Sequence, residues 1–132
     1  MTLNRRWIIA LGFTALLGAT AVQAQEIETA KVPFAFSVNG KPQQAGSISA
    51  TRSGNLVVIR NNDSHESMML LPVLASVRES AQPSLTFERY GTHYFLRKVH
   101  FDNGYVYEVQ RTKHEKELAK SEHSELIMVA MR

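Results

Sequence analysis

Apolar and polar residues alternate with a period of two along much of this chain, which is the pattern of half-buried β-strands. The clearest example is Val32–Val38, where Val32, Phe34, Phe36 and Val38 fall on one side. The same alternation predicts strands over Ser47–Arg52, Ser84–Tyr90 and Tyr105–Gln110.

Other segments are apolar without a clear alternation. Leu56–Ile59 is continuous and β-branched, which predicts a central strand covered on both faces. Further strands are predicted over Ser67–Leu74, where Pro72 should bend or end the pairing, over His93–Phe101, and over Glu125–Met131.

Turn residues separate these segments. Asn39-Gly40 and Asn103-Gly104 are typical of tight hairpin turns, because both residue types accept positive φ. Ser53-Gly54-Asn55 and Gly91-Thr92 predict two more turns. We expect Gln25–Lys31 to be a polar lead-in and Lys41–Gly46 to be a connection.

One segment favours a helix. Thr112 and Glu115 have the spacing of a capping box, and good helix formers follow over Lys113–Lys120. Since so short a helix is marginal in water, we expect Leu118 to hold it against the sheet. About eight short strands with one helix predict an all-β fold, either an antiparallel β-sandwich or a small β-barrel.

The N-terminus has the three parts of a cleavable export signal. Arg5 and Arg6 form the basic start, residues 7–21 form a short apolar core, and Val22-Gln23-Ala24 offers small residues to a signal peptidase. The apolar run is shorter than the ~20 residues of a spanning helix. The sequence thus predicts a signal over 1–24, by the general secretory or the twin-arginine route, and a single periplasmic or extracellular β-rich domain over 25–132.

Removal of the signal changes the charge balance. Without Arg5 and Arg6, 13 of the 15 basic residues remain against 12 acidic ones, which disfavours a nucleic-acid partner because such partners need a basic face. The chain has no cysteine, so it holds no disulfide and no thiol chemistry.

Several motifs occur in a familiar order. They are Val32-Pro33-Phe34-Ala35-Phe36, Asn39-Gly40-Lys41, Ala45-Gly46, Leu56–Asn61, Leu85–Gly91 with Tyr94-Phe95-Leu96, and Glu117–Ser121. This order resembles a family of short secreted bacterial proteins of unknown function. The resemblance implies export and a β-rich fold, and it implies nothing about mechanism.

The histidines and methionines raise the question of a metal site. His114 and Glu117 lie one turn apart on the predicted helix, with His123 beyond, but the arrangement lacks the three fixed ligands of a zinc site. The methionine pairs Met68/Met69 and Met128/Met131 have opposite strand parity, which favours core packing over copper binding.

Catalytic patterns are equally weak. Ser47 lacks the Gly-x-Ser-x-Gly context of a hydrolase nucleophile, and Glu88 is best explained by a cross-strand ion pair near Arg89. We therefore expect neither catalytic residues nor a metal or other cofactor. An unrecognised enzyme site, if present, would gather around His114 and Glu117.

The aromatic hairpin offers the one candidate site. Tyr94, Tyr105 and Tyr107 cluster there, and they would form an interaction face if directed outward or core packing if directed inward. The function we expect is a non-enzymatic exported binding or interaction module. The alternative is a small-molecule carrier with a lipocalin-like apolar cavity lined by Phe34, Phe36, Phe87 and Phe95. The expected partner is accordingly an unidentified protein or a small apolar ligand.

Overall fold

The computed structural model describes residues 26–77 and 82–132. The predicted signal over 1–24 lies outside the described residues. The described chain forms eleven strands and one helix, which confirms an all-β fold with one helix. Among the described residues, no helix is long and apolar enough to cross a membrane.

The strands form two sheets. The first has the order β1-β4-β5-β6, from β1 (Glu26–Val32), β4 (Gly46–Ser53), β5 (Leu56–Asn61) and β6 (Ser67–Leu70). The second has the order β11-β8-β9-β10-β7, from β7 (Val73–Val77), β8 (Ser84–Tyr90), β9 (His93–His100), β10 (Tyr105–Glu108) and β11 (Ser124–Ala130). The hairpin of β2 (Phe36–Val38) and β3 (Lys41–Gln43) joins the second sheet through β9.

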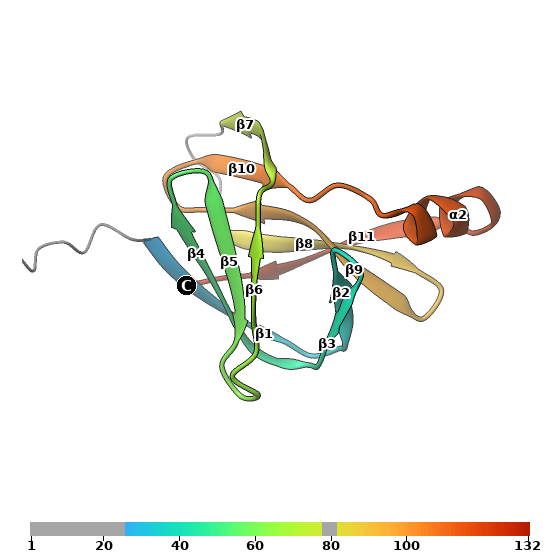
Figure 1. Cartoon of the computed structure of the whole chain (residues 1–132), viewed down its shortest axis with the longest axis horizontal. Helices are drawn as coiled ribbons and strands as arrows, with labels where there is room; N and C mark the ends of the chain where they lie inside the picture. Colours follow the sequence, from blue (N-terminus) through green and yellow to red (C-terminus); the bar gives the residue numbers. More distant parts are fainter. Residues whose placement is uncertain (1–25, 78–81) are drawn as a thin grey trace, which may run out of the picture.

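The two sheets face each other across a common core (Figure 1). In this view β4, β5 and β6 cross in front of β8, β9 and β11. The sheets also meet along one side, where Thr29 of β1 and Arg132 exchange two backbone hydrogen bonds of 2.9 Å each. The arrangement is therefore a two-sheet sandwich that is joined at one seam.

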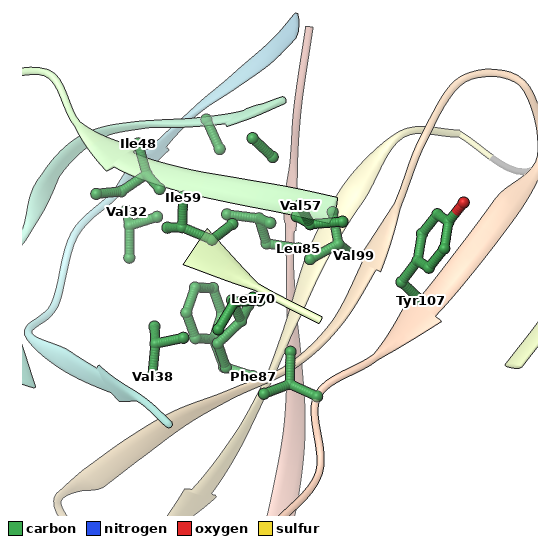
Figure 2. Packing of buried hydrophobic residues seen from close by; sticks show 14 of the residues in the cluster. Val32, Val38, Ile48, Val57, Ile59, Leu70, Leu85, Phe87, Val99 and Tyr107 are labelled. Atoms are coloured by element: carbon green, nitrogen blue, oxygen red, sulfur yellow. The ribbon is translucent and has the colours of Figure 1, made fainter. Parts of the chain in front are cut away.

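The core draws residues from both sheets (Figure 2). Ile48, Val57 and Ile59 of the first sheet pack with Leu85, Phe87 and Val99 of the second. The rings of Phe34 and Phe36 lie edge-on to Phe87, with centroid distances of 4.9 and 5.0 Å. Edge-to-face packing of this kind adds to the stability gained from burial alone.

Three differences raise the strand number from the predicted eight to eleven. The segment expected to be a polar lead-in is β1, which pairs with β4 along its whole length. The segment expected to be a plain connection contains β3. The run predicted as one strand over Ser67–Leu74 divides at Leu71-Pro72, because proline cannot donate to the sheet, and β6 and β7 then belong to different sheets.

One further predicted strand and one burial prediction also change. The strand predicted over Val32–Val38 is interrupted after Val32, because Pro33 has no N–H, and restarts at Phe36. The prediction that Leu56–Ile59 is covered on both faces is wrong. In β5, Val57 and Ile59 are buried and Val58 is only half-buried, because the first sheet packs against the core on one face.

The predicted turns occur at the expected positions in the chain. Asn39 and Gly40 have φ of 52° and 83° and connect β2 to β3, as the hairpin pattern requires. Gly104 has φ of 92°, but the connection from β9 to β10 is longer than a two-residue turn, since it spans residues 101–104.

Candidate functional site

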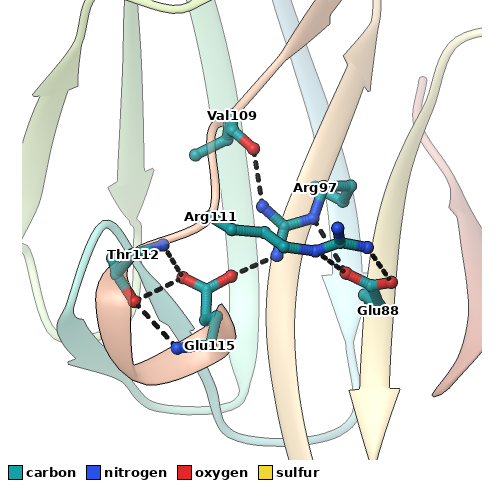
Figure 3. Close-up of polar contacts among 6 residues, drawn as sticks. All are labelled: Glu88, Arg97, Val109, Arg111, Thr112 and Glu115. Atoms are coloured by element: carbon teal, nitrogen blue, oxygen red, sulfur yellow. Dashed lines mark hydrogen bonds and ion pairs between the residues drawn. The ribbon is translucent and has the colours of Figure 1, made fainter. Parts of the chain in front are cut away.

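A network of buried charges covers the face of β8 and β9 that points away from the core. Glu88 lies on β8 and Arg97 on β9, and both side chains are 6 % exposed. The segment after β10 and the helix α2 (Lys113–Ser121) lie over them (Figure 3). This cover explains why β8 is buried on both faces.

Arg97 is the centre of this network. Its Nε donates to Oε1 of Glu88 at 3.1 Å, and its Nη1 donates to the backbone carbonyl oxygen of Val109 at 2.6 Å. Its Nη2 donates to Oε1 of Glu115 on α2. The guanidinium thus connects two strands and the helix, which suits its planar, five-donor geometry.

Arg111 reaches the same carboxylate from the segment before α2. Its Nε and Nη2 donate to the two oxygens of Glu88 at 3.1 and 2.8 Å, a bidentate pair. Burial by itself would raise the pKa of Glu88, but the hydrogen bonds from Arg111 and the charges of Arg97 and Arg111 lower that pKa. Glu88 is therefore held in its ionised form.

Glu115 completes the network and begins the helix. Its Oε2 accepts hydrogen bonds from the backbone N–H and the hydroxyl of Thr112 at 3.1 and 3.0 Å, while its own N–H donates to that hydroxyl at 3.3 Å. The predicted capping box is therefore confirmed. Leu118, which was predicted to hold the helix against the sheet, is half-buried, whereas Glu115 is fully buried and bonds to Arg97 of β9.

This network is chemically saturated at its centre. The hydrogen bonds above engage both oxygens of Glu88 and of Glu115 and all three nitrogens of Arg97. A pocket of about 470 Å³ lies beside it, with Lys98, Glu108 and Lys116 among its lining residues. The arrangement fits the attachment of α2 to the second sheet better than proton transfer, which needs a group that can gain or lose a proton.

The cross-strand explanation of Glu88 is confirmed, with different partners from those expected. Glu88 pairs with Arg97 of the neighbouring strand and with Arg111. Arg89 instead pairs with Glu125 on β11 at 2.6 Å, in a contact that is largely open to solvent. Sequence reasoning missed Arg97 as a site residue, because nothing local marks an arginine inside an aromatic strand as buried.

The three tyrosines do not share one environment. Tyr107 lies in the core, with its ring 5.9 Å from Phe101. Tyr105 and Tyr94 are half-buried and pack against that core. Tyr94 stacks on Phe34, with ring centroids 3.9 Å apart. The guanidinium carbon of Arg52 lies 5.4 Å from the ring centroid of Tyr105. The tyrosines were expected to form either an outward interaction face or part of the core, and Tyr107 belongs to the core.

The residues of the metal and hydrolase hypotheses are also placed. His114, Glu117 and His123 are exposed on or just after α2, and the described residues contain no group of three or more His, Asp or Glu arranged to hold a metal ion. Ser47 lies at the start of β4 and bonds to the turn after β5, where its N–H donates to Asp63 at 3.0 Å and its hydroxyl accepts from Asn62 at 3.3 Å.

In each methionine pair one side chain is buried and the other is exposed, as expected for residues that point to opposite faces of a strand. Met68 and Met131 are buried in the core, whereas Met69 and Met128 are exposed. Core packing is thus the role of one methionine in each pair.

The four aromatic residues of the carrier hypothesis do not gather around one cavity. Phe34, Phe36 and Phe87 pack ring against ring, and Phe95 lies on the other face, 5.9 Å from Tyr90. The pocket that Phe36 and Phe95 help to line has a volume of about 190 Å³. Ligand pockets usually measure roughly 300–1,000 Å³, so this pocket is small for a lipocalin-like ligand.

A second feature is an apolar segment on the surface, residues 69–77, at β6 and β7. Five of its large side chains are between 48 and 80 % exposed, namely Met69, Leu71, Val73, Leu74 and Val77. All five residues of β7 are exposed. Exposed apolar residues are ordinary when they occur singly, but a concentration of them is typical of a binding surface.

Comparison with known proteins gave no match to a family model, to a curated protein or to a solved structure.

Proposed function

We propose that this protein is an exported, non-enzymatic binding module that attaches to another polypeptide through its apolar segment, residues 69–77. The observation that carries the proposal is the exposure of five large apolar side chains within nine consecutive residues. Burying them against a partner would recover roughly 25 cal/mol for each Å² removed from water.

The position of β7 indicates how a partner would bind. β7 is the last strand in the order of the second sheet and pairs with β10 on one side. The other side of an edge strand presents N–H and C=O groups to an added strand. Alternate apolar side chains of that added strand would pack beside Leu74 and Val77, which the register with β10 places on one face. The partner proposed is therefore an extended polypeptide segment with alternating apolar residues.

Export is the second part of this proposal. The basic start, apolar core and small residues of 1–24 support it, as does the resemblance to short secreted bacterial proteins. Amino-terminal sequencing of the protein recovered from its host's envelope or medium should begin at Gln25. An intact Met1 in a cytoplasmic fraction would contradict export.

The binding proposal is tested by site-specific photo-crosslinking in the native host. A photoreactive residue at Leu71 should give one discrete adduct, and the same residue at exposed Glu117 on α2 should not. The double variant Leu71→Ser/Val73→Ser should abolish binding of the identified partner by the purified protein while the melting temperature stays within a few degrees. Equal adducts at both positions, or binding unaffected by the double variant, would refute the proposal.

A further inference from the structure

The edge of the second sheet opposite β7 is formed by β11. This strand pairs with β8 over seven consecutive residues, from Ser124 to Ala130, without a register shift. In the sheet order β11 has β8 as its single neighbour. At the C-terminal end of this edge, β1 lies on the same outer side: Thr29 exchanges backbone bonds with Arg132, and β1 contacts β11 near Ala130. The open part of the edge is therefore the part before Ala130.

The backbone hydrogen bonds next to β11 show which of its residues face outward. Arg132 exchanges its bonds with β1, on the outer side, while the N–H of Met131 donates to Pro83, on the β8 side, at 2.9 Å. Because these directions alternate along an extended strand, the even-numbered residues of β11 direct their N–H and C=O groups away from β8. Those residues are Ser124, Leu126, Met128 and Ala130.

The same residues carry exposed apolar side chains. Leu126 and Met128 are 63 and 64 % exposed and lie on the face of the second sheet that also holds Glu88. On the core face, Ile127 and Val129 are only half-buried. A strand added along this edge would therefore cover apolar surface on both faces as well as pair the free backbone groups.

Natural proteins usually protect such an edge with lysine, proline, a bulge or a very short strand. Ser124–Ala130 has none of these devices, and its one charged residue, Glu125, already pairs with Arg89. The β7 edge is shorter, follows Pro72 and pairs with β10 across a register shift. Of the two edges, β11 is therefore the longer and more regular one.

We propose that β11 pairs with β11 of a second copy of this chain, antiparallel about a two-fold axis at Ile127. In this register Leu126 of each copy lies opposite Met128 of the other, and both belong to the outward-facing, hydrogen-bonding set. Glu125 lies opposite Val129, so no like charges oppose each other. The strand is thus complementary to itself, as a two-fold interface requires. The result is one sheet continuous across two copies.

This contact uses a different edge from the proposed function and does not depend on it. Sedimentation velocity of the purified protein, from micromolar to millimolar concentration, should show a monomer–dimer equilibrium. Met128→Lys places a charge beside Leu126 of the second copy and should raise Kd about tenfold or more. Met69→Lys, an equally exposed position on β6, should leave Kd unchanged. A monomer throughout, or equal effects of the two variants, would overturn the proposal.

The register has its own test, because the natural chain has no cysteine. At the two-fold axis the two Ile127 residues form a non-hydrogen-bonded pair, with Cα atoms roughly 4.5 Å apart, which suits a disulfide. Ile127→Cys should therefore oxidise to a covalent dimer that keeps the native melting temperature. Leu126→Cys, although more exposed, should cross-link at least about tenfold more slowly, since Leu126 faces Met128. Faster cross-linking of Leu126→Cys would overturn the Ile127-centred pairing.

Discussion

The guanidinium of Arg97 and the carboxylate of Glu115 form an ion pair that is buried on both sides, with side-chain exposures of 6 and 3 %. The two residues come from β9 and α2, eighteen positions apart in the chain. A helix as polar and as short as α2 has little apolar area to bury, so this pair supplies much of its attachment to the sheet.

Glu115→Gln should therefore destabilise the fold strongly. The variant leaves Arg97 with one carboxylate partner in a buried position, and breaking a buried pair typically costs about 3–5 kcal/mol. Urea unfolding followed by circular dichroism would measure the loss. Glu117→Gln, on the exposed side of the same helix, should change stability by less than about 0.5 kcal/mol. Similar losses for both variants would contradict the assigned role of Glu115.

The helix illustrates what local sequence can and cannot predict. The capping box of Thr112 and Glu115 was predictable, because both partners lie within one turn. The second role of Glu115 was not, because its partner Arg97 is brought close only by the packing of α2 on β9. Leu118 was the natural apolar anchor from sequence alone, yet the buried contact is polar.

The missed strand β1 has a similar physical explanation. Its core-facing residues include Glu28 and Ala30, whereas Ile27 points to solvent and is 61 % exposed. Apolar residues on the wrong face and a buried carboxylate hide the period-two signal. Glu28 is tolerated there because its Oε2 accepts the N–H of Asp102 at 3.0 Å, a contact between residues far apart in sequence.

The division of Ser67–Leu74 was only partly predictable. Pro72 indicates that pairing must stop, which the structure confirms. No local signal shows that the chain then crosses to the other sheet, since β7 is paired by β10, more than twenty residues later. The same crossing exposes the apolar segment, so the main element of the proposed binding surface could not be located from sequence.

The aromatic cluster around Phe87 should dominate core stability. Phe87 has no exposed surface and meets two other rings edge-on. Phe87→Ala should cost about 3–5 kcal/mol, the range for large cavities in a packed core. Phe34→Ala, which truncates a half-buried ring stacked on Tyr94, should cost clearly less. Equilibrium unfolding of both variants gives the comparison, and equal losses would contradict this description of the core.

Gly46 should resist substitution for two reasons. Its φ is +152°, a region that side chains rarely adopt, and an added Cβ would collide with the carboxylate of Asp63. Gly46→Ala should thus cost roughly 1–3 kcal/mol. Gly54→Ala is the matched control, because Gly54 also has positive φ, +64°, but open space around it. Thermal unfolding should show the larger loss at Gly46, and the reverse order would rule out the steric argument.

Acid should weaken this fold partly through Glu88. Its pKa in the folded protein is lowered below the ordinary value of 4.5, since the hydrogen bonds and charges of its arginine partners outweigh the effect of burial. A lowered folded-state pKa stabilises the fold above the unfolded-state pKa, and that stabilisation is lost as the pH falls through the folded-state value. The free energy of unfolding, measured in urea between pH 7 and pH 3, should therefore fall below about pH 4.5.

Glu88→Gln separates this contribution from those of the other acids. The variant should be less stable than the natural protein at pH 7, because Arg97 and Arg111 lose a charged partner, and its stability should depend less on pH below 4.5. Glu125→Gln removes a largely exposed carboxylate whose pair is screened by solvent, so its pH profile should follow that of the natural protein. If Glu88→Gln kept the full acid dependence of the natural protein, the lowered pKa would have to be assigned to another carboxylate.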